Sequence, residues 1–237
     1  MLYVAMGMVV LVGACLQGVG GIGFAMFSAP IAGLFFPGLA PGPLIVLGGS
    51  VSMLSVVREF AAIDWPVVGS ALSGRALGTL VAAGLLATLP VNAISVLFAA
   101  MILGAVALSL AGWRVQATRG NVAVAGTVSG VMGTITSAGA PPLALVMQHM
   151  SPPRLRATVG CVFVAGAVMS VGMLTVVGRF DLPHLWLSAS LLPWLAVGFA
   201  MSGRVGRRIS PPGMRWLLLG LCVVGAVGIL AKVAYLS

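Results

Sequence analysis

The chain has 237 residues, of which 60% are hydrophobic and 6% are charged. A soluble domain carries about 25% charged residues, so a chain with this composition has too few charges to cover its surface as a water-soluble domain does. The apolar runs are long and continuous, without the alternation over about ten residues that marks a membrane β-barrel. We therefore predict an all-α polytopic membrane protein of about eight hydrophobic segments.

The charge of the chain is strongly basic, with 12 Lys and Arg against 3 Asp and Glu, for a net charge of +9. The arginines stand singly or in small groups between apolar runs. This is the pattern of cytoplasmic loops under the positive-inside rule, so we predict the lipid bilayer and not nucleic acid as the partner. The expected location is a bacterial inner membrane, crossed several times. The three cysteines are far apart in apolar stretches, which predicts no metal site.

The first 57 residues carry no charge and are too long for a single crossing of about 20 residues. We expect segment 1–36 to enter the membrane and return, broken at Gly18-Val-Gly-Gly-Ile-Gly23, with further breaks at Pro30 and Pro37. A second broken segment is expected at 121–150, around several glycines and Pro141-Pro142. Three long helices follow each broken segment, at about 41–58, 66–89 and 91–112, and at about 155–178, 185–205 and 215–236.

The arginines orient these segments. Three loops should be cytoplasmic because they hold basic residues: Arg114 and Arg119; Arg154 and Arg156; and Arg204, Arg207, Arg208 and Arg215. Segment 121–150 lies between the first two loops, so both of its ends should be cytoplasmic. Counting back through the helices puts both ends of segment 1–36 outside.

Two local matches indicate an internal repeat. The first, at an offset of 112 positions, pairs Gly18-Val19 with Gly130-Val131, Gly21 with Gly133, and Pro30 with Pro142. The second, at an offset of 129, pairs the stretch Trp65–Arg75 with Trp194–Arg204. We expect a first repeat at 1–113 and a second at 120–237, which together form one transport domain. Three crossings per half invert the second repeat, as in secondary transporters.

The residues that carry these patterns also resemble a known family. The glycine-rich turn Gly18–Gly23 with Pro30, the second set Gly130, Gly133 and Pro141-Pro142, and the small-residue helix around Gly69, Gly74 and Gly78 are similar to the TauE/SafE family of membrane transporters. In this chain Ile22 interrupts the family's run of three glycines. The resemblance implies a transporter that exports a small anion such as sulfite, an organosulfonate or a related carboxylate.

The glycine-rich turn also fits the G-x-G-x-x-G pattern of dinucleotide sites. Such a site needs an acidic residue about 20 positions on, but the next acidic residue is Glu59, so we predict no cofactor. A helix broken at mid-membrane leaves N–H groups free, and these favour an anion. The alternatives are that the glycines only allow close helix packing, and that Ser and Thr side chains near the breaks bond their own backbone.

Arg75 is the charged residue placed deepest, about ten residues or roughly 15 Å inside its helix. A charge at that depth is costly and usually functional, although snorkelling or a bond to backbone carbonyls would also explain it. The repeat implies the same depth for Arg204, whereas the span count puts it near a helix end. The candidate substrate-binding residues are Gln17, Gly18, Gly20, Gly21, Ser28, Pro30, Arg75, Ser129, Gly130, Gly133, Thr134, Thr136, Ser137, Pro141 and Pro142.

Two other functions compete with a secondary transporter, namely an anion channel and a membrane-embedded enzyme. The sequence offers no convergent acid, base or nucleophile, so we predict no catalytic residue and no enzyme. A coupling ion, proton or sodium, and a homodimer are both compatible with the sequence. The expected partner is a small anionic substrate.

Overall fold

A computed structural model describes residues 1–111, 115–206 and 211–236, and side chains throughout these ranges except at 211–215, 217 and 236. In chain order, the α-helices are α1 (Leu2–Gly20), α2 (Phe24–Phe35), α3 (Gly42–Arg58), α4 (Trp65–Thr88), α5 (Val91–Leu110), α6 (Arg119–Thr136), α7 (Ala140–Val146), α8 (Pro152–Val176), α9 (Leu182–Val205) and α10 (Pro211–Leu236). Two short 3-10 helices, η1 (Pro37–Leu39) and η2 (Phe60–Ala62), flank α3. The all-α prediction is confirmed, and helices lie at all six positions where long helices were expected, although α3, with 17 residues, is shorter than a membrane-crossing helix of about 20. Of the orienting arginines, Arg114, Arg207 and Arg208 lie outside the described residues.

Among the residues that the structure describes, six helices are long and apolar enough to cross a membrane: α1, α4, α5, α8, α9, and Leu218–Tyr235 of α10. The two broken segments each combine a long arm with a short one. The short arms α2 and α7 have 12 and 7 residues, or about 18 and 10 Å, which is less than the ~30 Å of a bilayer core. Each broken segment is therefore a hairpin whose second arm is too short to cross the bilayer by itself.

The first break occupies the second half of the stretch Gly18–Gly23 in which the sequence predicts it. Helix α1 continues through Gly18 and ends at Gly20, and Gly21 closes it in the left-handed region, with φ 81°. There a glycine avoids the strain that a side chain would bring. The predicted break at Pro30 is wrong, because Pro30 lies inside α2. Pro30 has no N–H for the carbonyl of Met26, and the thiol of Cys222 from α10 donates to that carbonyl instead, at 3.2 Å.

The second break lies between Thr136 and Ala140. Ser137 closes α6 with φ 64°, and its N–H donates to the carbonyl of Gly133 at 2.9 Å. Helix α7 then begins with two prolines in its first turn, where their missing N–H groups leave no bond unmade. Gly133, like Gly130, therefore lies within α6 and not at the break.

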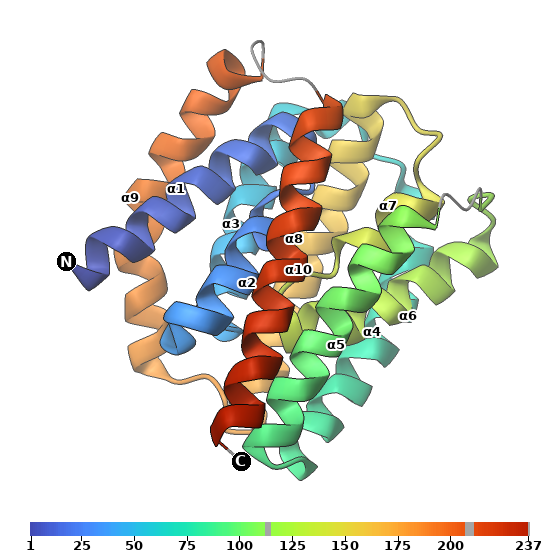
Figure 1. Ribbon diagram of the computed structural model, residues 1–237. Helices are drawn as coiled ribbons and strands as arrows, with labels where there is room; N and C mark the ends of the chain where they lie inside the picture. The colour runs from blue at the N-terminus through green and yellow to red at the C-terminus, as the bar shows by residue number, and fades with distance from the viewer. Residues whose placement is uncertain (112–114, 207–210, 237) are drawn as a thin grey trace.

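The helices pack in pairs across the two halves of the chain. Helix α1 lies against α9, α4 against α6, α3 against α8, and α5 against α10 (Figure 1). The short arm α2 packs on α10, and the short arm α7 packs on α5. Exchanging α1–α5 with α6–α10 in order leaves this set of pairs unchanged, as a two-fold relation between two repeats would require.

Close helix contacts explain two of the three glycines in the small-residue helix. A Cβ at Gly74 would overlap the carbonyl of Ala123, and one at Gly78 would overlap the carbonyl of Thr127, so α4 and α6 touch backbone to backbone. Gly69 does not share this face, because it is exposed with no neighbour within 4 Å. Five residues turn a helix by about 140° beyond one full turn, which carries Gly69 away from α6.

The same contacts correct the second repeat match. A Cβ at Gly198 of α9 would overlap the carbonyl of Leu11 in α1, just as a Cβ at Gly74 of α4 would overlap the carbonyl of Ala123 in α6. Leu11 and Ala123 are 112 positions apart, which agrees with the first match, but Gly74 and Gly198 are 124 apart and not 129.

Of the two placements of Arg204 that the sequence left open, the one near a helix end is confirmed. Arg75 is buried in the middle of α4, whereas Arg204 is exposed in the last turn of α9. The reason is the start of α9: Asp181 accepts a hydrogen bond from the N–H of His184 and caps the helix well before Trp194.

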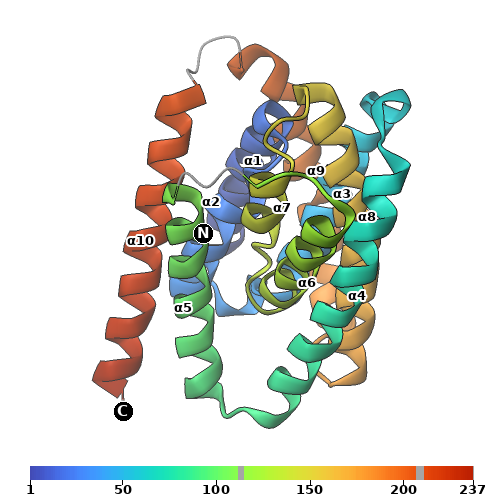
Figure 2. The same cartoon turned by 90° about the vertical axis from the view of Figure 1, so that its right-hand side faces the viewer.

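The two ends of the molecule are named after the orientation predicted from the sequence. The inner end holds the loop from Glu59 to Asp64, the start of α8 and the end of α9 (upper end of Figure 2). The outer end holds the turn between α4 and α5 and the turn between α8 and α9. Which end faces the cytoplasm stays a prediction.

Candidate functional site

A small cavity lies between the two breaks. Its volume is about 40 Å³, and it is lined from the first hairpin by Gln17, Ile22, Phe24 and Ala25, from α3 by Leu44, Ile45, Gly48, Gly49 and Ser52, from α4 by Arg75, from the second hairpin by Gly133, Ser137, Gly139 and Ala140, and from α8 by Phe163 and Ala167. We call it the central cavity. Both broken segments and the crossing of α3 with α8 therefore build one site.

Arg75 supplies the charge of the central cavity. Its side chain is buried, with 4% of its surface exposed, and its Nη1 donates to the hydroxyl of Ser129 at 2.8 Å. The hydroxyl of Ser129 donates in turn to the carbonyl of Gly139 at the second break, at 2.6 Å. The guanidinium also stands 5.5 Å from the ring centre of Phe163, and its Nε has no hydrogen-bond partner.

No acidic residue balances this charge. The chain has three carboxylates, and each is paired elsewhere: Glu59 with Arg58 and Arg156, Asp64 with Arg154, and Asp181 with His184. Two glycines leave room for the guanidinium, because a Cβ at Gly133 or Gly166 would run into it. The cavity lining thus includes a buried guanidinium without an acidic partner, which is an arrangement suited to an oxyanion.

Gln17 holds the first break together. Its amide nitrogen donates to the carbonyl of Gly21 at 2.8 Å and makes a longer bond of 3.4 Å to the hydroxyl of Ser52. Its amide oxygen accepts from the N–H of Phe24, the first residue of α2, at 3.1 Å. Gln17 therefore satisfies backbone groups that the break leaves free, while also lining the central cavity.

At the second break, one hydroxyl faces the cavity and two serve the backbone or neighbouring helices. Ser137 lines the cavity and donates to the carbonyl of Pro41 at 3.0 Å. Thr136 donates to the carbonyl of Met132 at 2.7 Å, as the alternative interpretation of the sequence described. Thr134 bonds to the hydroxyl of Ser170 at 2.8 Å, so it ties α6 to α8.

The structure brings four of the candidate residues to the lining of the central cavity, namely Gln17, Arg75, Gly133 and Ser137, and Ser129 supports Arg75. The others lie away from the lining and serve packing or other cavities. Gly18 packs on Ser202, Gly21 on Arg156, Gly130 on the α4 backbone, and Pro30 on Gly225, while Ser28 is buried beside Gly13 without a partner. Gly20 and Pro141 line a separate cavity of about 350 Å³, and Pro142 is buried at the start of α7.

Sequence reasoning missed what α3 and α8 contribute. Ser52, Phe163 and Gly166 all border Arg75 or the cavity, and none of them stands near a predicted break. The available signal was the glycine pair Gly48-Gly49 in α3 and the single aromatic residue of α8, Phe163. Neither feature indicates a site until the crossing of the two helices is known.

A larger cavity opens at the outer end. It has a volume of about 380 Å³ and is bordered by Arg179, His184 and Pro41 among others. Because Ser137 bonds the carbonyl of Pro41, this hydrogen bond stands between the central and outer cavities. The N–H and ring of His184 hold the pKa of Asp181 below its usual value.

Comparison with known proteins agrees with this architecture. The family model described as Sulfite exporter TauE/SafE matches residues 5–229, which is nearly the whole chain. The chain belongs to the TauE/SafE family. It is similar to the "Probable inner membrane transporter protein TsaS" of Comamonas testosteroni, with 29% identity over 204 residues that cover 79% of this chain and 81% of that protein. No solved structure matches.

Membership of the TauE/SafE family, together with six helices long enough to cross a membrane, makes this chain a multi-pass membrane transporter. In this TauE/SafE protein the residues in and beside the glycine-rich turn divide into those that line the central cavity and those that pack against other helices. Gln17 and Ile22 line the central cavity, whereas Gly18 and Gly21 contact Ser202 and Arg156 behind it.

Proposed function

We propose that the chain is a secondary transporter that exports a small oxyanion across the inner membrane, with sulfite, an organosulfonate or a related carboxylate as the substrate class. One observation carries the proposal: the buried guanidinium of Arg75 faces the cavity between the two breaks without any acidic partner. A buried charge of this kind is unfavourable until a counter-charge arrives. An anion whose oxygens fit the guanidinium fork would supply it.

The size of the central cavity favours a small charged group. A volume of about 40 Å³ is room for roughly three water molecules at about 10–15 Å³ each. Only the head of a larger sulfonate would fit without movement of the surrounding helices. The neutral lining residues Gln17, Ser52 and Ser137 add hydrogen-bonding groups to the single charge.

Alternating access between two inverted repeats, 1–113 and 120–237, is the mechanism we infer. The exchange of packing partners between α1–α5 and α6–α10 supports it, and so does the position of the cavity between the two hairpins. The hydrogen bond from Ser137 to the carbonyl of Pro41, between the central and outer cavities, favours a carrier over a channel. The cavity lining contains a cation and neutral polar groups without an acid, base and nucleophile in reach of one another, which favours transport over catalysis.

Efflux from proteoliposomes tests the function directly. Vesicles that hold the purified protein would be loaded in turn with sulfite, methanesulfonate and acetate, and the release of each would be followed. We expect at least one of these anions to leave at a rate that saturates with its concentration. Release that rises without limit would indicate a channel, and the same release from protein-free vesicles would reject the proposal.

Filling the central cavity should stop transport. Leucine at Gly133 would push a side chain against the Nη2 of Arg75, because even a Cβ there would lie 2.9 Å from that atom. We expect Gly133→Leu to abolish efflux while the protein still inserts into the membrane. The control is Gly20→Leu, because Gly20 is exposed and borders the separate cavity near Pro141. Equal loss in both variants would show that the loss does not come from filling the central cavity.

The predicted orientation can be tested at two exposed positions, Gly38 before α3 and Ser151 before α8. Single cysteines at these positions, in a background without the native cysteines, should react with an impermeant thiol reagent from opposite sides of the membrane. Gly38→Cys should react from outside and Ser151→Cys from the cytoplasm. Labelling of both from one side would contradict the topology.

A further inference from the structure

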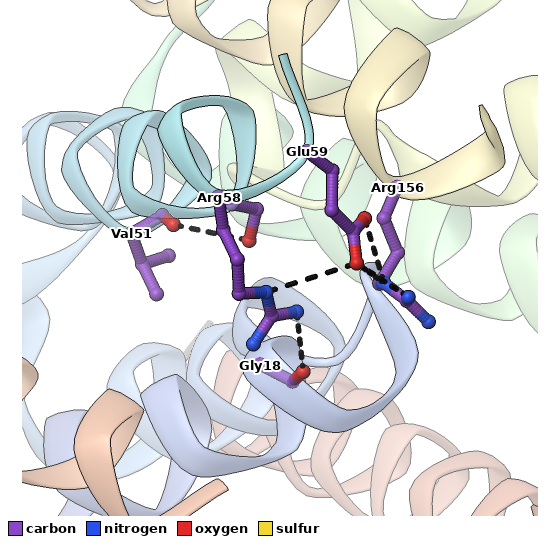
Figure 3. A network of polar contacts seen from close by, with 6 residues as sticks. Gly18, Val51, Arg58, Glu59 and Arg156 are labelled. Carbon is purple, nitrogen blue, oxygen red and sulfur yellow. Dashed lines mark hydrogen bonds and ion pairs between the residues drawn. The ribbon is translucent and has the colours of Figure 1, made fainter. Parts of the chain in front are cut away.

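Three charged side chains meet at the inner end, directly behind the first break (Figure 3). Arg156, in the first turns of α8, places its Nε 3.0 and 3.1 Å from the two carboxylate oxygens of Glu59. Arg58, at the end of α3, approaches the same carboxylate with its Nε at 3.7 Å. Two guanidiniums thus share one carboxylate, which leaves a net positive charge at this point.

Both arginines also contact the first break. The Nη2 of Arg58 donates to the carbonyl of Gly18 in the last turn of α1, at 3.2 Å (Figure 3). The aliphatic stem of Arg156 covers Gly21, where a Cβ would lie 2.6 Å from the Cγ of that arginine. Gln17 and Ile22, on either side of these two glycines, line the central cavity. The charged cluster therefore covers the inner side of the wall that closes the cavity.

The position of Glu59 is one that an oxyanion would take. A carboxylate held by a guanidinium through two oxygens has the same geometry as a bound carboxylate or sulfonate. The side chains of Glu59 and Arg156 keep 15% and 19% of their surfaces exposed, so an anion from the inner solution can reach them. An anion that binds the two arginines must displace Glu59, and this removes one of the contacts that hold α8 to the loop after α3.

We propose that Arg58 and Arg156 form a second anion-binding site at the inner end, which Glu59 occupies when the transporter is closed and which the transported oxyanion takes to open the first break. This inference rests on the proposed function for the identity of the anion. It does not rest on Arg75, because the two sites share no residue.

The chain supplies a matched control for this site. Asp64 and Arg154 form another ion pair between the same loop and the same end of α8. Neither of them contacts the hairpin of the first break in the described contacts, and Arg154 is more exposed. Loss of this second pair removes a similar charge contact but should leave the break closed.

The experiment reports on the cavity without requiring transport. Ser52 lines the central cavity and is fully buried, so a cysteine there should react slowly with an impermeant, positively charged methanethiosulfonate reagent. The native cysteines would be replaced as Cys15→Ala, Cys161→Ala and Cys222→Ser, the last to keep a donor for Met26. In inverted membrane vesicles, Glu59→Gln should raise the rate at which Ser52→Cys reacts by about tenfold, or ~1.4 kcal/mol in the opening equilibrium. Asp64→Asn should leave the rate unchanged.

The anion is tested in the same vesicles with methanesulfonate against chloride at equal ionic strength. Methanesulfonate should speed the reaction when Glu59 is intact, and it should do so equally after Arg75→Ala, because the second site is separate. An acceleration that disappears with Arg75→Ala would assign the effect to the central cavity, which overturns this inference and leaves the proposed function standing. An equal rate in Glu59→Gln and Asp64→Asn would also overturn it. If Glu59→Gln fails to insert, Glu59→Asp weakens the same contact because its side chain is one methylene shorter, and an unchanged rate in that variant would count against the site.

Discussion

Replacing Arg75 with alanine should nearly abolish anion transport while the protein still folds. In the described parts of the chain the guanidinium is the one charge that borders the central cavity, and its loss removes a charge-assisted bond worth about 2–3 kcal/mol in apparent binding. That corresponds to roughly 30- to 150-fold in the concentration at which transport half-saturates. Folding should survive because Arg75 has no acidic partner that alanine would leave buried alone, and Ser129 keeps its bond to Gly139.

Lysine at the same position separates charge from shape. Arg75→Lys keeps the charge but lacks the planar fork, so we expect weakened but measurable transport. Efflux from proteoliposomes would be compared with that of Arg119→Ala, which removes an exposed arginine at the start of α6. If Arg75 were only structural, both Arg75 variants would lower the melting temperature in detergent, and their transport per folded molecule would match that of the wild type.

Valine at Gly74 should have the largest effect on stability. A side chain there would overlap the carbonyl of Ala123, and since backbone lies on both sides of the contact, neither helix can yield locally. Overpacked sites cost about 1–3 kcal/mol and occasionally more, and we expect the upper end of that range or beyond. Separation of α4 from α6 would also displace Arg75 from Ser129, so transport should fail together with folding.

The control for Gly74 lies on the same helix. Gly69 and Gly84 have no neighbour within 4 Å of an added Cβ, so Gly69→Val and Gly84→Val should fold with nearly wild-type melting temperatures. The measurement is the fraction of protein that stays monodisperse in detergent on heating. A Gly74→Val protein as stable as these two controls would show that the close contact of α4 and α6 does not limit stability.

The fold could be predicted from the sequence largely because the bilayer restricts the choices. Long apolar runs must be helices, and the glycines and prolines of segments 1–36 and 121–150 marked both broken hairpins. The sites of the breaks were harder to place. Gly18 and Pro30 both remain helical, since tertiary contacts decide there: Gly18 fits against Ser202, and the thiol of Cys222 meets the carbonyl that Pro30 leaves without a partner.

The candidate site was predicted in part. Depth along a helix placed Arg75 at the centre, and proximity to a break placed Gln17, Gly133 and Ser137 on the cavity lining. Proximity to a break did not predict the roles of Thr134 and Thr136, because their hydroxyls bond Ser170 and the α6 backbone and do not line the cavity. The cavity residues of α3 and α8 were not predicted either, because a single sequence does not show where two helices cross in space.

The two helices that end the repeats, α5 and α10, have a role apart from the cavity. Among the described residues, neither helix contributes to the lining of the central cavity, yet α10 packs on α2, α5 packs on α7, and the two lie side by side (Figure 2). The short arms do not cross the bilayer by themselves, and peptide groups without a partner at their ends would be costly in contact with hydrocarbon. By packing on the short arms, helices α5 and α10 shield these ends from the lipid. Substrate preference can therefore change through the cavity residues alone, whereas damage to α5 or α10 would admit lipid to the hairpins and disable transport of every substrate alike.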